Sequence, residues 1–180
     1  MMTDLGSARR SRVWRLAVAV FFGTAAFLVT AAVAADPAVA APAGDGAIHE
    51  LRTVSGQGWF YTLNATEAQR AVSQFHFRPS ATFGALHTTG GPGRQAIHRL
   101  RSKTAQSYLL SVSPQEITNP AFVDEGVFGF VDTAPHPGER KLLRFSNHGQ
   151  WRVLSDAPAN IANMQRAGYT VDGPLGWARP

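Results

Sequence analysis

The chain has 180 residues, a formal net charge of +5 and no cysteine. Four arginines and one acid precede Ala35, so the rest of the chain holds 13 basic and 11 acidic residues. A surplus this small and this evenly spread excludes a nucleic-acid footprint. The lack of cysteine excludes disulfides, a thiol nucleophile and thiolate metal ligands, so the hydrophobic core alone must hold the domain together.

The first 34 residues have the pattern of an export signal. Four arginines between Arg9 and Arg15 precede an apolar stretch over residues 16–34, which ends on a small-x-small cleavage site. The stretch is also about long enough to span a bilayer, so an uncleaved N-terminal anchor is the alternative. We expect a secreted or extracytoplasmic protein that contacts membrane only through this segment, if it stays uncleaved. Residues 35–47, rich in Ala, Pro and Gly, are typical of a flexible linker.

Residues 48–180 contain an internal repeat. Ile48, Leu51 and Glu67 recur as Ile97, Leu100 and Glu116, and a third copy begins at Leu142. The predicted copies cover about residues 48–96, 97–141 and 142–180. Repetition at a spacing of about 45 to 49 residues indicates one supersecondary unit used three times.

Each copy is predicted to begin with a β-hairpin, because two apolar stretches flank a short polar turn. The first strands are Ile48–Thr53, Ile97–Ser102 and Leu142–Ser146, and the second strands are Trp59–Thr62, Tyr108–Ser111 and Arg152–Ser155. A short helix follows, because Ser113 to Glu116 has the order of a capping box and Asn64 to Glu67 has the same spacing. In the third copy Asp156 can cap the helix and Gly168 can end it.

Each copy ends on a glycine-centred apolar strand. These strands are Thr82–Leu86, Val127–Val131 and Pro174–Ala178. A glycine inside such a strand predicts a bulge or a close approach of another backbone. We therefore predict a single α+β domain, in which three units of β-hairpin, short helix and strand close around a shared core with pseudo-threefold symmetry. The alternative is a β-trefoil, because Gln57–Gly58–Trp59 matches the Gln-x-Trp of trefoil lectins, although the capped helices argue against it.

The pattern resembles a family of secreted bacterial and fungal repeats, domain of unknown function 5648. The matching motifs are Ile97–Leu100, Leu142–Phe145, Trp59–Thr62, Glu125–Phe128 and Ala167–Tyr169. The chain departs from the family at its usual histidine, which is replaced by Trp59, Tyr108 and Arg152. The resemblance implies a secreted repeat domain and implies no activity, because the family has none assigned.

Seven residues are candidate ligand-binding residues: Trp59, Tyr61, Tyr108, Trp151, Arg52, Arg101 and Arg144. Aromatic rings can stack on sugars, and clustered guanidinium groups suit an anionic ligand such as a sugar acid. Trp151 is the best stacking candidate, because it lies beside the turn and out of register with the other copies. For the arginines we favour a structural interpretation, in which they pair with Glu67 and Glu116 or with backbone carbonyl groups between units, and we expect most of the aromatic rings to lie in the core.

No catalytic motif, metal site or cofactor site is predicted. His49 and His98 occupy equivalent positions, but the third copy has Leu143 there, so a symmetric histidine set is incomplete. We predict a secreted non-catalytic binding module for envelope or extracellular carbohydrate or for a protein partner. The alternatives are a small secreted hydrolase that uses Glu67 or Glu116 as its acid, and an inhibitor or immunity-type partner of a secreted enzyme.

Overall fold

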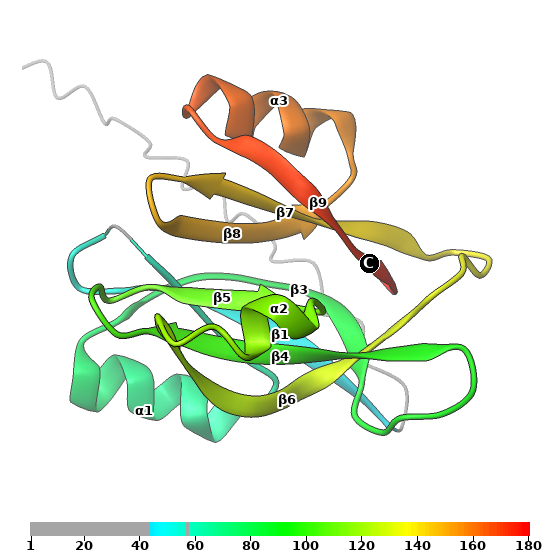
Figure 1. Ribbon diagram of the computed structural model, residues 1–180, viewed down its shortest axis with the longest axis horizontal. Helices are drawn as coiled ribbons and strands as arrows, with labels where there is room; N and C mark the ends of the chain where they lie inside the picture. The colour runs from blue at the N-terminus through cyan, green and yellow to red at the C-terminus, as the bar shows by residue number, and fades with distance from the viewer. Residues whose placement is uncertain (1–43, 57) are drawn as a thin grey trace, which may run out of the picture. The chain divides into compact units, whose positions relative to one another are not determined.

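The computed structural model describes residues 44–56 and 58–180 (Figure 1). The chain divides into two units, residues 1–38 and 39–180, and every described residue lies in the second. The predicted export signal, most of the predicted linker and Gln57 lie outside the described residues. None of the helices found from residue 44 onward is long and apolar enough to cross a membrane.

Three stretches of the described chain share the element order strand, strand, helix, strand. Segment 1 comprises β1 (Asp45–Arg52), β2 (Trp59–Thr62), α1 (Ala65–Phe75) and β3 (Arg78–His87). Segment 2 comprises β4 (Arg94–Ser102), β5 (Tyr108–Ser111), α2 (Pro114–Ile117) and β6 (Phe122–Asp132). Segment 3 comprises β7 (Arg140–Asn147), β8 (Gln150–Ser155), α3 (Pro158–Arg166) and β9 (Thr170–Ala178).

The first strand of each segment lies between the other two and pairs antiparallel with both, which gives the ribbons β2–β1–β3, β5–β4–β6 and β8–β7–β9. Single-residue pairings join these ribbons, His87 with Phe130 and Asp132 with Trp177. The nine strands thus form one open sheet. In Figure 1, α1 lies at the bottom of the view and α3 at the top, with strands between them.

The predicted α+β fold with closed pseudo-threefold symmetry is wrong, and so is the β-trefoil alternative. Strands make up 51% of the described structure and helices 18%, so the protein is mainly an antiparallel β-sheet. The error arose because the third strand of each segment begins four or more residues before its glycine-centred part. The start of β3, residues 78–82, is exposed and polar in pattern, but its backbone pairs with β1. Helix α2 has only four residues.

The central hydrophobic cluster draws side chains from all three segments. Its members include Ile48, Tyr61, Leu86, Ile97, Leu110, Val131, Leu142, Val153 and Leu175. Smaller clusters lie under α1, where Ala71 meets Phe60 and Phe77, and under α3, where Met164 meets Phe145. Burial of these apolar side chains is the main favourable term available to a chain without disulfides.

Only the first of the three predicted N-caps forms as expected, whereas the predicted glycine stop of α3 is confirmed, because Gly168 follows the C-cap Ala167 with φ +81°. The Asn64 side chain accepts hydrogen bonds from the backbone N–H groups of Thr66 (2.8 Å) and Glu67 (3.1 Å), as an N-cap does. Ser113 precedes α2 without capping it through its side chain. Helix α3 begins after Ala157, so Asp156 is not its N-cap.

The predicted close approach of another backbone is confirmed at Gly84 and Gly176, whereas only side chains lie close to Gly129. A Cβ atom at Gly176 would lie 2.5 Å from Val131 Cγ2 and 2.9 Å from the Asp132 carbonyl oxygen, and one at Gly84 would lie 2.9 Å from the Arg179 carbonyl oxygen. At Gly129 a Cβ atom would lie 3.0 Å from Leu63 and 3.1 Å from Leu86. These glycines therefore lie where segments touch one another.

We expect Gly176→Ala to lower the free energy of unfolding by about 2 kcal/mol more than Gly173→Ala does. Both glycines have positive φ, +142° and +155°, but the space around Gly173 is open, whereas Val131 beside Gly176 is fully buried. The comparison separates crowding from backbone strain, and urea unfolding measures it. Equal losses in the two variants would contradict close packing at Gly176.

Candidate binding cleft

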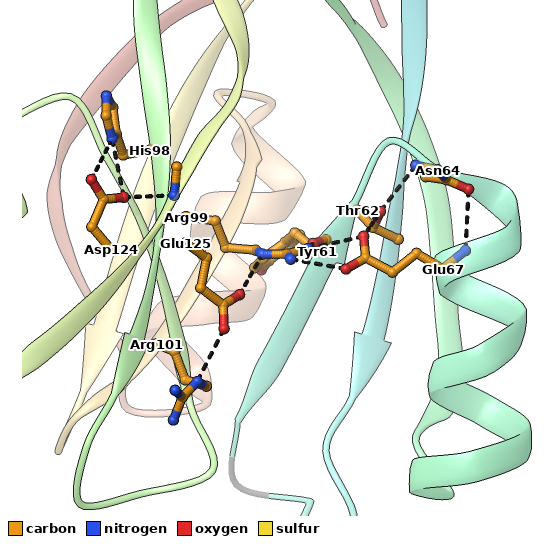
Figure 2. A network of polar contacts seen from close by, with 10 residues as sticks. Tyr61, Thr62, Asn64, Glu67, His98, Arg99, Arg101, Asp124 and Glu125 are labelled. Carbon is orange, nitrogen blue, oxygen red and sulfur yellow. Dashed lines mark hydrogen bonds and ion pairs between the residues drawn. The ribbon is translucent and has the colours of Figure 1, made fainter.

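Two arginines join consecutive segments by nearly the same contacts. Arg99 on β4 donates to both carboxylate oxygens of Glu67 on α1, at 2.9 and 3.2 Å, and to the carbonyl oxygen of Tyr61 at 2.7 Å. Its Nε donates to Glu125 at 2.9 Å, so the guanidinium group lies between two glutamates (Figure 2). We call this bidentate pair a clasp.

Arg144 on β7 makes the second clasp. It donates to both carboxylate oxygens of Glu116 on α2 at 2.7 and 2.8 Å, to the Leu110 carbonyl oxygen at 3.2 Å and, through Nε, to Asp172 at 2.9 Å. Bidentate charge-assisted pairs of this kind are the strongest and most directional hydrogen bonds that side chains make. The structural interpretation of the arginines is therefore confirmed for Arg144.

At the junction between segments 3 and 1 the charges are reversed, because the first strand of segment 1 carries the carboxylate and segment 3 carries the arginine. The carboxylate of Glu50 on β1 is buried and accepts both Nε and a terminal nitrogen of Arg152 on β8, at 3.1 and 3.0 Å. Tyr61 donates to the same carboxylate at 3.3 Å and accepts the backbone N–H of Val153 at 2.9 Å. Burial and the Glu50 charge raise the pKa of Tyr61 well above its usual value, so its hydroxyl stays protonated.

The glutamates of both clasps have lowered pKa values. Partial burial alone would raise the pKa of Glu67, but hydrogen bonds from Arg99 and Thr62 outweigh it. Burial opposes ionisation at Glu116 too, and hydrogen bonds from Arg144 and Ser111 lower its pKa. Both carboxylates are therefore ionised at neutral pH and bonded at both oxygens.

A cavity of about 530 Å³ lies between α1 and the β4–β5 hairpin, and the first clasp forms part of its wall. We call it the α1 cleft. Its aromatic lining consists of Phe60, Phe75, Phe77 and Tyr108. The Phe60 ring meets Tyr108 at 5.0 Å and Phe77 at 5.6 Å, both edge-to-face, while Phe75 is 60% exposed at the rim. The lining thus combines a fixed aromatic surface with one accessible ring.

The charged lining of the α1 cleft has three arginines, Arg70, Arg99 and Arg101, against the glutamates Glu67 and Glu125. Arg101 is 44% exposed and uses only Nε on Glu125, at 3.0 Å, so its terminal nitrogens have no hydrogen bond to the described residues. Arg70 is exposed and forms no ion pair with them. Burial and the Glu125 charge raise the pKa of Tyr108, which keeps its hydroxyl a donor at neutral pH.

Of the seven sequence-predicted site residues, only Tyr108 and Arg101 line the α1 cleft. Trp59 is 5% exposed in the central core, with the guanidinium groups of Arg52 and Arg152 at 4.6 and 4.0 Å from its ring centre. Tyr61 is fully buried at the Glu50 junction. Arg144 is held in the second clasp.

Trp151 lies beside the β7–β8 turn, as predicted, but it is not out of register with the other segments. It pairs with Ser146, as Trp59 pairs with Arg52 and Tyr108 with Arg101, so it is in register with them. The expected register was wrong by one residue in the third segment. The Trp151 ring is half-buried and packs edge-to-face on Phe122 at 5.6 Å, which makes it part of the contact between segments 2 and 3.

Sequence analysis missed Phe75, Phe77 and Arg70 as lining residues. Phe75 and Arg70 lie on α1, and Phe77 lies two residues beyond its end. Only the packing of this helix beside segment 2 brings the three residues to Tyr108. No sequence pattern indicated this placement, because only the structure shows that Val72 and Phe75, two large apolar residues of α1, stay exposed. The histidines considered as metal ligands lie apart from the cleft, His98 on Asp124 at 3.0 Å and His49 on Thr82 at 3.2 Å.

No protein-family model, curated protein or solved structure matches the chain. The resemblance to domain of unknown function 5648 therefore depends on the short motifs alone.

Glu116→Gln is expected to reduce the loss in the free energy of unfolding that acidic pH causes. Because the pKa of Glu116 is lowered in the folded protein, its pairing with Arg144 stabilises the fold above the unfolded-state pKa, and this stabilisation is lost as pH falls through the folded-state pKa. The wild-type free energy of unfolding should decrease below about pH 4.3. The Gln variant should be less stable by about 1 kcal/mol at neutral pH and should lose less on acidification.

Urea unfolding at neutral and acidic pH measures both effects. Gln115→Ala, an exposed change on the same short helix, keeps every ionisable group and should follow the wild-type pH profile. An equally steep acid loss in Glu116→Gln and wild type would contradict the clasp's contribution.

Proposed function

We propose that the protein is an exported, non-catalytic binding module whose α1 cleft takes an acidic carbohydrate. The observation that carries this proposal is the exposed Arg101 beside the aromatic lining. Its terminal nitrogens bind none of the described residues and can meet a carboxylate, while Tyr108 and Phe75 offer ring surfaces. Export is supported by the basic and apolar pattern of residues 9–34.

The cleft chemistry favours a sugar acid over a neutral sugar. Its lining carries one more positive than negative charge, and both glutamates already have arginine partners, so the unused hydrogen-bonding capacity is cationic. A guanidinium fork matches a carboxylate in two parallel hydrogen bonds. Aromatic faces stack on the apolar faces of sugar rings, and the Tyr108 hydroxyl adds a neutral donor.

The clasp chemistry argues against the hydrolase alternative. A glycosidase acid must hold a proton at working pH, which requires a raised pKa. The pKa values of Glu67 and Glu116 are instead lowered, and an arginine occupies both oxygens of each carboxylate. Neither residue is therefore suited to donate a proton to a leaving group.

Titration calorimetry with a galacturonic acid oligosaccharide tests the proposal. We expect measurable binding that a neutral galactose oligosaccharide of equal length does not show. Arg101→Gln and Tyr108→Ala should each weaken binding by about tenfold, because each removes a direct contact at the centre of the cleft. Arg140→Gln, which removes an exposed arginine outside the cleft, is the matched control and should bind as wild type does.

Equal binding of the charged and neutral sugars would refute recognition through Arg101. Binding of neither sugar, combined with capture of a defined secreted protein that Arg101→Gln fails to capture, would support the protein-partner alternative and overturn the carbohydrate proposal.

A further inference from the structure

A second cluster of titratable side chains lies outside the α1 cleft, where β3 and β6 end. His87 is the last residue of β3, Asp132 is the last residue of β6, and Glu139 directly precedes β7. One ligand atom from each lies within 4.8 Å of the others. The connecting loop adds His136, whose Nε2 lies 3.9 Å from Asp132 Oδ1.

Asp45 holds the His87 ring in a fixed orientation through its Nδ1 side. Its Nδ1 lies 2.8 Å from Asp45 Oδ1, and the other oxygen of Asp45 accepts Arg179 at 2.6 Å. Both ring nitrogens face a carboxylate, since Nε2 lies beside Asp132. A cation at Nε2 would replace the hydrogen there, and the Asp45 carboxylate would keep the hydrogen on Nδ1. Histidines that bind metals commonly have this backing, which orients the ring and raises its basicity.

The opposite side of the ring faces oxygen donors. His87 Nε2 lies 2.8 Å from Asp132 Oδ2, and the Asp132 side chain is only 8% exposed. The carboxylate of Glu139 is held in place by the backbone N–H of His136, at 2.9 Å. A cation between the Asp132 and Glu139 carboxylates would offset the repulsion between their negative charges.

The surrounding charges favour a cation over an anion. A cavity of about 260 Å³ adjoins the cluster and gives room for an ion with its water. The fixed charges around it are Asp45, Asp132 and Glu139 against Arg94 and Arg179. Arg179 is already paired with Asp45, and Arg94 reaches Asp132 only at 3.9 Å while donating to the Thr89 carbonyl oxygen. With neutral histidines the ionised cluster is therefore negative by one unit.

We propose that this cluster binds one Zn²⁺ ion. The proposed ligands are His87 Nε2, His136 Nε2 and the carboxylates of Asp132 and Glu139. Two imidazoles with two carboxylates form a mixed nitrogen and oxygen set that Zn²⁺ accepts, whereas Ca²⁺ and Mg²⁺ prefer oxygen ligands throughout. The ion joins the ends of β3 and β6 to the loop before β7, and so ties segments 1 and 2 to the loop that leads into segment 3, in a protein without disulfides.

Titration calorimetry and thermal unfolding of the chelator-treated, untagged protein test the proposal at pH 7.5, where histidine is mainly neutral. We expect one Zn²⁺ per chain and a higher Tm in Zn²⁺, since a ligand that binds only the folded state stabilises it. Mg²⁺ and Ca²⁺ at the same concentration should leave the Tm unchanged.

His136→Gln and Glu139→Gln should each weaken Zn²⁺ binding by at least about tenfold. Both residues lie at the loop, so these changes should keep the fold. His148→Gln, which removes an exposed histidine in the β7–β8 turn, is the matched control and should bind as wild type does. Absence of stoichiometric Zn²⁺ binding, or equal affinity in His136→Gln, Glu139→Gln and His148→Gln, overturns the proposal, as does an equal Tm rise with Ca²⁺.

Discussion

The relative orientation of the three segments depends on partly buried charge pairs that join them. Each of the three ribbons leaves one face of its strands to be covered by the others, and the central cluster supplies the apolar part of that contact. Apolar contact alone does not fix how the segments are oriented relative to one another, because it is non-directional. The clasps of Arg99 and Arg144 and the Glu50 junction fix this orientation, because a bidentate guanidinium–carboxylate pair tolerates little displacement. Such buried pairs are more a device for orientation than a large source of stability.

The first clasp also links the fold to the α1 cleft. Arg99 holds α1 to segment 2 through Glu67, and the space between them is the cleft. Glu125 accepts both Arg99 and Arg101, so the exposed guanidinium is positioned by the same carboxylate that completes the clasp. A ligand would therefore meet a wall that packing has already ordered, which reduces the entropy lost on binding.

Local features of the fold could be predicted from the sequence, and long-range features could not. The Asn64 cap, the close approaches at strand glycines and the pairing of Arg144 with Glu116 each follow from a short pattern or a spacing. The fold class did not follow, because exposed strand starts such as residues 78–82 have no apolar pattern and form through backbone pairing. The cleft and the His87 cluster join residues more than 30 positions apart, such as Phe75 with Tyr108 and His87 with Asp132.

The reversed polarity of the Glu50 junction has a consequence for assembly. Strand pairing places Glu50, Arg99 and Arg144 at corresponding positions in β1, β4 and β7, opposite Tyr61, Leu110 and Val153. A segment 2 that took the place of segment 1 would set Arg99 against Arg152, and the opposite exchange would set Glu50 against Glu67. Like charges in these half-buried places are costly. The reversed charges thus disfavour any arrangement, within one chain or between two chains, in which one segment takes the place of a different segment.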